Sequence, residues 1–179
     1  RRQRQMCIRD RLRSFQNYIP DEAEYEIATY TLSLKARIRG STHGHWVPLP
    51  ARGAAFVWRT FGGPKIERFV GDIDVVHGTN FLVPPSKVSR VISVHDLSFL
   101  NDCRSDRNSN RRFDHSVKEA VNSGATVHTI SEHVAEEIRD KYGAKDVRVV
   151  YPGVEQKPAV TKTFPEQPTL LAVGATNRR

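Results

Sequence analysis

Long apolar runs and cysteines are both scarce in this sequence. No run of apolar residues approaches the roughly 20 that a helix needs to cross a bilayer. The two cysteines, Cys7 and Cys103, lack the spacing of a metal site and are too few for a disulfide framework. The sequence therefore argues against a membrane-spanning or disulfide-stabilised protein, and we expect a reducing, cytoplasmic setting.

Several motifs that mark common catalytic and cofactor sites are also missing. There is no G-x-G-x-x-G turn, no phosphate-binding Walker loop and no G-x-S-x-G nucleophile turn. The seven histidines show neither the H-x-x-x-H nor the H-E-x-x-H spacing of a metal site. We therefore expect no bound metal and no resident cofactor.

The excess of positive charge is concentrated in the first residues. The formal net charge is +8, and residues 1–13 hold six arginines against one acid, Asp10. The remaining 166 residues hold 22 basic and 19 acidic side chains, which is an ordinary balance. The charge therefore predicts no nucleic-acid partner, and a non-catalytic basic module that binds nucleic acid or membrane is kept only as an alternative.

Residues 1–13 are set aside from the fold. The segment from Gln5 to Arg11 matches the translation of a common transposon-adaptor sequence. The alternative is a natural, disordered basic tail. On the first interpretation we expect the chain to be truncated at this end.

Short apolar runs recur along the second half of the chain. They are rich in β-branched residues and are followed by turn or polar residues, which is typical of buried strands. We predict such strands at residues 73–76, 91–94, 125–130 and 147–150.

Amphipathic segments separate the later runs. Apolar residues at helical spacing predict helices at 112–123 and 131–142, ended by Gly124 and Gly143, and Ser131 is a good N-cap. Strands that alternate with helices predict an α/β fold with a Rossmann-like parallel sheet flanked by helices.

The rest of the chain divides by composition. Residues 25–30 alternate at period two and predict another strand, whereas the Gly- and Pro-rich residues 40–64 predict irregular structure. We expect one domain over 14–154, a proline-containing linker over 155–168, and the first strand of a second, truncated domain over 169–179.

Candidate functional residues follow the predicted strands. In open parallel sheets, ligands bind outside the carboxyl ends of the strands. His77 with Gly78, and His95 with Asp96, stand at two such ends. An imidazole can exchange a proton near neutral pH, so we expect a functional role for His95. A loop-filling role for His77 and a turn-capping role for Asp96 are equal alternatives.

Four other polar residues receive structural interpretations. Ser131 is expected to cap a helix, and His128 to be a packed or edge histidine of its strand. His115 and His133 are expected to face solvent.

An ordered series of motifs resembles a known family. The segments at 74–81, 84–85, 94–100, 128–132, 149–154 and 171–179 are similar, in this order, to the N-terminal domain of family-four retaining glycosyltransferases. These are the glycogen-synthase-like enzymes with two facing Rossmann-like domains. The resemblance implies a glycosyltransferase of the hexosyltransferase type. Such an enzyme would transfer a sugar from a nucleotide-sugar donor and retain the anomeric configuration of that sugar.

The resemblance also implies roles for individual residues. His95 of the V-H-D-L-S motif would position the donor sugar, and Asp96 beside it is the second candidate catalytic residue. His77, Gly78 and Asn80 match the loop that faces the acceptor. Arg178 or Arg179 matches the start of a basic stretch that contacts the donor diphosphate.

The departures from the family matter as much as the matches. The family's first strand, its glycine-rich loop, its acidic pair and its nucleotide pocket have no counterpart in this sequence. We therefore expect the chain alone to be inactive, as the N-terminal half of a two-domain enzyme truncated at both ends. A nucleotide-sugar epimerase of the same architecture is the enzyme alternative.

The resemblance also implies partners and a setting. We expect a carbohydrate or lipid-linked acceptor, no metal, and a role in polysaccharide biosynthesis. The expected location is cytoplasmic, with peripheral contact at the inner membrane face left open.

Overall fold

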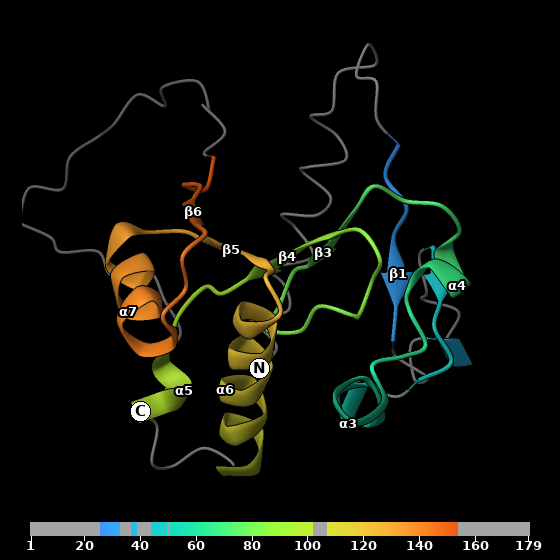
Figure 1. Cartoon of the computed structure of the whole chain (residues 1–179), viewed down its shortest axis with the longest axis horizontal. Coiled ribbons are helices and arrows are strands. Elements are labelled where there is room, and N and C mark those ends of the chain that lie inside the picture. The colour runs from blue at the N-terminus through green and yellow to red at the C-terminus, as the bar shows by residue number, and fades with distance from the viewer. Residues whose placement is uncertain (1–25, 33–36, 39–43, 50, 102–106, 154–179) are drawn as a thin grey trace, which may run out of the picture.

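The computed structural model describes residues 26–32, 37–38, 44–49, 51–101 and 107–153. Its main sheet contains four parallel strands that follow one another in sequence order: β3 (Val75–Gly78), β4 (Ser89–Ser93), β5 (Thr126–Thr129) and β6 (Val147–Val149). The four predicted strands and their parallel arrangement are confirmed. Together with the flanking helices they form an α/β Rossmann-like fold (Figure 1).

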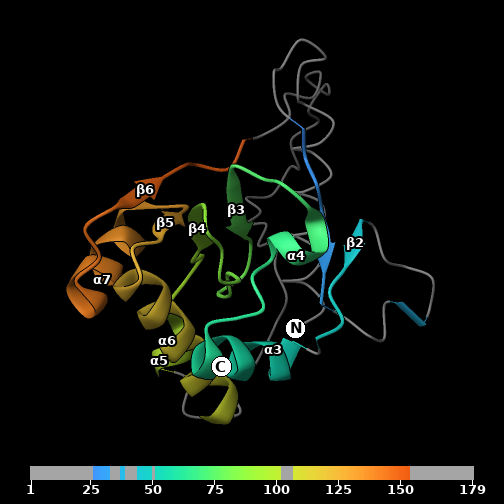
Figure 2. The same ribbon diagram turned by 45° about the vertical axis from the view of Figure 1, so that its right-hand side comes forward.

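Three helices lie on one side of this sheet. They are α5 (Ser98–Asn101), α6 (Arg107–Asn122) and α7 (Glu132–Tyr142), and Figures 1 and 2 both show them below β4 and β5. Ile92 and Val127, paired neighbours on β4 and β5, are buried in one core cluster with Val117 of α6 and Ile138 of α7. Burial of this apolar face holds the strands, and hence their carboxyl ends, in fixed positions.

The helix ends follow local signals only in part. The Ser131 side chain accepts a hydrogen bond from the Val134 amide at 3.3 Å, and Gly143 ends α7 in the left-handed conformation with φ +64°, as predicted. Helix α6 begins at Arg107, five residues before the predicted start at Arg112. Its first turn is polar, so no apolar periodicity marks it in the sequence.

A second, two-stranded parallel sheet lies beside the first. It pairs β1 (Tyr30–Thr31) with β2 (His45–Trp46). Val47, which follows β2, is buried in an apolar cluster with Ile66 and with Val76 of β3. The predicted strand at 25–30 is wrong in extent. Residues 26–29 have no regular structure and only Tyr30 is paired, while Tyr25 lies outside the described residues.

The prediction of irregular structure over 40–64 is wrong for most of its described part. Residues 51–61 form helix α3 (Ala51–Phe61), which buries Trp58, and residues 45–46 form β2. Prolines precede the helix and the Gly62-Gly63-Pro64 turn follows it, so apart from Gly53, in the first turn, the helix-disfavouring residues flank the helix. A further short helix, α4 (Glu67–Val70), follows that turn and was not predicted.

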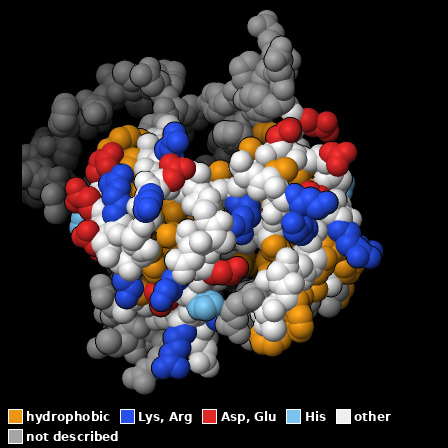
Figure 3. Space-filling model, viewed as in Figure 1, with side chains coloured by type: hydrophobic (Ala, Val, Ile, Leu, Met, Phe, Trp, Pro, Cys, Tyr) orange, Lys and Arg blue, Asp and Glu red, His pale blue; other side chains and the backbone are white. Residues whose placement is uncertain are grey.

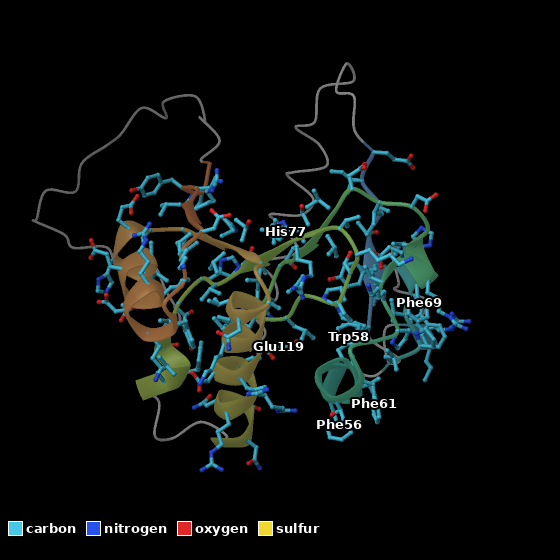
Figure 4. All side chains as sticks on the ribbon, viewed as in Figure 1. Phe56, Trp58, Phe61, Phe69, His77 and Glu119 are labelled. Atoms are coloured by element: carbon cyan, nitrogen blue, oxygen red, sulfur yellow. The ribbon has the colours of Figure 1, made fainter. Side chains whose placement is uncertain are left out.

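The surface of the described chain is mixed in character. Basic and acidic side chains are interspersed on the face shown in Figure 3, and hydrophobic side chains gather over α3, where Phe56 and Phe61 are exposed. In Figure 4 these two rings point away from the molecule, whereas Trp58 points toward it. Along the part of the chain that the structure describes, no helix is both long enough and apolar enough to cross a membrane.

Candidate functional site

Four polar side chains gather at the carboxyl ends of the three strands β3, β4 and β5. Ser93 pairs with His128 in the register of β4 and β5, and His77 pairs with Val91, two residues before Ser93. Since side chains alternate between the faces of a strand, His77, Ser93 and His128 share the face opposite Ile92 and Val127. His95, two residues beyond Ser93, completes this group, which we call the histidine cluster.

Hydrogen bonds join the members of the cluster. Ser93 Oγ lies 2.7 Å from His77 Nε2 and 2.8 Å from His128 Nδ1. The His77 and His128 rings meet edge to face, with centroids 5.8 Å apart, and the His95 ring meets His128 in the same way at 6.4 Å. Ser93 is only 2% exposed, whereas the side chain of His77, which is labelled in Figure 4, is exposed. The cluster therefore has a buried hydroxyl group, that of Ser93, at its centre, and the imidazole of His77 is exposed to solvent.

His95 is held by the loop that follows β3. Its Nε2 lies 3.2 Å from the Thr79 carbonyl oxygen. A carbonyl can only accept, so Nε2 is the donor and carries a proton. This bond and the shared contact with His128 place His77 and His95 at the same end of the sheet, where parallel strands were expected to bring them.

Asp96 makes contacts typical of a turn. Its Oδ1 accepts hydrogen bonds from the Ser98 amide at 3.0 Å and from the Ser98 hydroxyl at 2.5 Å. Ser98 is the first residue of α5, so this carboxylate organises the start of that helix. These contacts fit the structural alternative for Asp96, and its catalytic role stays a prediction.

The loop after β3 doubles back onto β4. The Phe81 amide donates to the Ser93 carbonyl oxygen at 3.2 Å, and the buried Phe81 ring contacts Phe99 and Phe113. Phe81 adopts a left-handed conformation with φ +53°, which is rare for a large side chain. The tight return leaves Asn80 exposed at the tip of the loop.

The structure lowers the pKa of His77 from 6.5 to about 4. The causes are, in order, burial of part of the ring, the charge on protonated His128 and the charge on protonated His95. At neutral pH the His77 imidazole is therefore uncharged. An uncharged imidazole can donate a hydrogen bond to a neutral hydroxyl group or accept one from it. It does not form an ion pair with a phosphate.

We expect an NMR titration to place the His77 midpoint at about pH 4. His128→Gln should raise this midpoint, because it removes the larger of the two like-charge effects, but leave it below 6.5 because burial remains. His115→Gln changes an exposed histidine on α6 and is the matched control. A wild-type midpoint near 6.5 would contradict the packing around His77.

The same pKa makes stability depend on pH. A proton binds the unfolded chain near pH 6.5 but the folded chain only near pH 4, so lowering the pH through this interval favours unfolding. The stabilisation is therefore complete above about pH 6.5 and is lost as the pH falls toward 4. Solvent at the exposed side of the ring screens the effect.

Sequence reasoning found the two outer histidines but missed the centre of the cluster. His128 is packed against the His77 and His95 rings, as one of its two predicted alternatives has it, and the edge alternative is wrong because β5 is an inner strand. Its hydrogen bond to Ser93 was not predicted. The available signal was a polar residue inside each of two apolar runs, Ser93 and His128. His115 and His133 are exposed, as predicted.

The remaining predicted site residues, Arg178 and Arg179, lie outside the described residues. Within the described ranges, no group of three or more His, Cys, Asp or Glu side chains could hold a metal ion. The site that the structure does describe is thus an assembly of imidazoles, a hydroxyl and backbone carbonyls.

Comparison with known proteins gives one match. Neither a search of curated proteins nor a search of solved structures returned a similar protein. A model of the family described as Glycosyltransferase Family 4 matches residues 20–157, well over half of the chain. Five of the six segments that suggested this family lie within the match, 74–81, 84–85, 94–100, 128–132 and 149–154, and three of these five contain the histidines of the cluster. The chain therefore belongs to glycosyltransferase family 4.

Proposed function

We propose that this domain binds the acceptor of a retaining, glycogen-synthase-like glycosyltransferase that takes its sugar, a hexose, from a nucleotide-sugar. Membership of the family supports binding of a sugar donor and an acceptor in general. The observation that carries the finer proposal is the histidine cluster at the carboxyl ends of β3, β4 and β5, where open α/β sheets bind ligands.

In this proposal the residues divide by ligand. The exposed His77, near the end of β3, and Asn80, on the loop that follows Gly78, face the acceptor. His95, whose Nε2–H is directed to the Thr79 carbonyl, positions the donor sugar beside it, with Asp96 adjacent. Residues 155–168 act as a linker to a donor-binding domain that opens at 169, and Arg178 or Arg179 contacts the donor diphosphate. No metal or cofactor takes part.

The biological setting is a further proposal. A hydroxyl-rich acceptor, free or lipid-linked, suits a role in polysaccharide biosynthesis in the cytoplasm. A lipid-linked acceptor would bring the enzyme to the inner face of the membrane. The exposed Phe56 and Phe61 of α3 offer apolar surface for such a contact.

Binding can be tested by NMR on the isotopically labelled chain. We expect neutral oligosaccharides to shift the resonances of His77 and Asn80, which face the acceptor in this proposal, and of His95, which is bonded to the same loop through the Thr79 carbonyl. UDP- and GDP-linked hexoses should shift them much less, because the proposed donor pocket lies in another domain. His77→Ala should weaken the oligosaccharide shifts.

His133→Ala removes an exposed histidine from α7, on the other side of the sheet, and is the matched control. Two results would contradict the proposal. One is an oligosaccharide panel that leaves the three resonances unchanged. The other is a set of shifts confined to α6 and α7.

A further inference from the structure

Ser93 occupies an unusual position between two imidazoles. Its hydroxyl contacts His77 Nε2 on one side and His128 Nδ1 on the other, at 2.7 and 2.8 Å. These are the two hydrogen bonds of the Ser93 side chain within the described residues. A hydroxyl has one proton to donate and two lone pairs with which to accept.

That single proton restricts the two rings. If Ser93 donates to His77, then His77 carries its own proton on Nδ1, and His128 must donate from Nδ1 to Ser93. If Ser93 instead donates to His128, then His128 carries its proton on Nε2, and His77 must donate from Nε2. In both arrangements the two neutral rings have the same tautomer.

A third arrangement is costly. Both rings could donate to Ser93 Oγ, but the hydroxyl proton would then need another acceptor. Ser93 is 2% exposed, so this proton would be buried without a partner among the described residues. An unsatisfied buried donor is unfavourable, which selects the two coupled arrangements.

We propose that Ser93 couples the tautomers of His77 and His128, so that His128 sets whether the second nitrogen of His77 offers a ligand hydroxyl a donor or an acceptor. Ser93 and His128 are then positioning residues that act through the exposed His77. Any group that meets the other nitrogen of His128 fixes both rings. The choice of a hydroxyl ligand rests on the proposed function, whereas the coupling itself does not.

Long-range proton–nitrogen NMR of the histidine side chains in the full chain, at about pH 7.5, which is above the ordinary histidine pKa, distinguishes the two tautomers directly. We expect His77 and His128 to share one tautomer in the wild type. Ser93→Ala should leave each ring with its own tautomer mixture. Ser93→Cys keeps the volume but donates weakly, so it should show the same loss if the alanine variant fails to fold.

Ser123→Ala is the matched control, because Ser123 donates only to carbonyls at the end of α6. It should leave both tautomers unchanged. Opposite tautomers in the wild type would overturn the coupling. So would tautomers that survive unchanged in both Ser93 variants.

A binding measurement completes the test. Ser93→Ala should weaken binding of the oligosaccharide that shifts His77 by about fivefold, the effect of one ordinary hydrogen bond, and Ser123→Ala should not. Shared tautomers without any oligosaccharide binding would overturn the proposed function and leave the coupling intact. Opposite tautomers in a protein that binds oligosaccharide would overturn the coupling and leave the proposed function intact.

Discussion

Gly78→Ala is expected to lower the free energy of unfolding by about 3 kcal/mol. A Cβ atom at this position would lie 2.1 Å from the Leu82 carbonyl oxygen and 2.8 Å from Val83 Cα. Both are backbone atoms, so no side chain can rotate away. Relief would require the loop from Thr79 to Leu82 to move, but Phe81 anchors that loop with its buried ring.

Urea denaturation followed by circular dichroism measures this loss. Gly153→Ala is the matched control, because a Cβ atom there would meet nothing within 4 Å and the residue is exposed. We expect the control to change stability by no more than about 0.5 kcal/mol. Equal stability of the two variants would show that the loop after β3 does not pack against β4 as described.

The sheet could be predicted because its signal is local. β-branched runs of four to six residues, together with the helices between the later runs, predict parallel strands. The ends of the strands were less predictable. The first apolar run predicts a strand at 73–76, yet β3 continues through Gly78, because backbone pairing with β4 does not depend on whether a side chain is polar. His77 consequently belongs to the strand and does not follow it.

The centre of the site depends on register, which one sequence does not reveal. Ser93 and His128 are 35 positions apart and become neighbours only because Ile92 pairs with Val127. A shift of one residue would place His128 on the helix-covered face. The missed helix α3 has another cause: composition argued against a helix, although the prolines and glycines lie mainly at its ends.

His95→Ala should reduce kcat by about 10²- to 10³-fold, measured in a transfer-competent protein that contains residues 1–179. The proposed role is to hold the donor sugar at the rim, where two contacts position the His95 ring. His95 Nε2–H is bonded to the Thr79 carbonyl, and the ring rests edge to face on His128. An interaction that strengthens as charge develops on the sugar affects kcat more than KM.

Folding must be separated from catalysis in this variant. His95→Ala loses one hydrogen bond to a backbone carbonyl, so we expect a stability loss of about 1 kcal/mol, too small to unfold the domain. His95→Gln keeps an N–H donor and should retain more activity than the alanine variant. His133→Ala, on the exposed side of α7, should retain full activity.

The anomeric configuration of the product, read by NMR in the same assay, tests the retaining mechanism independently. An unchanged kcat in His95→Ala would show that His95 has only a structural role, which is to join the ends of β3 and β4 through its hydrogen bond to Thr79. The exposed His77 would then be the cluster's contact with the ligand, and the donor sugar would have to be positioned entirely by residues outside this rim.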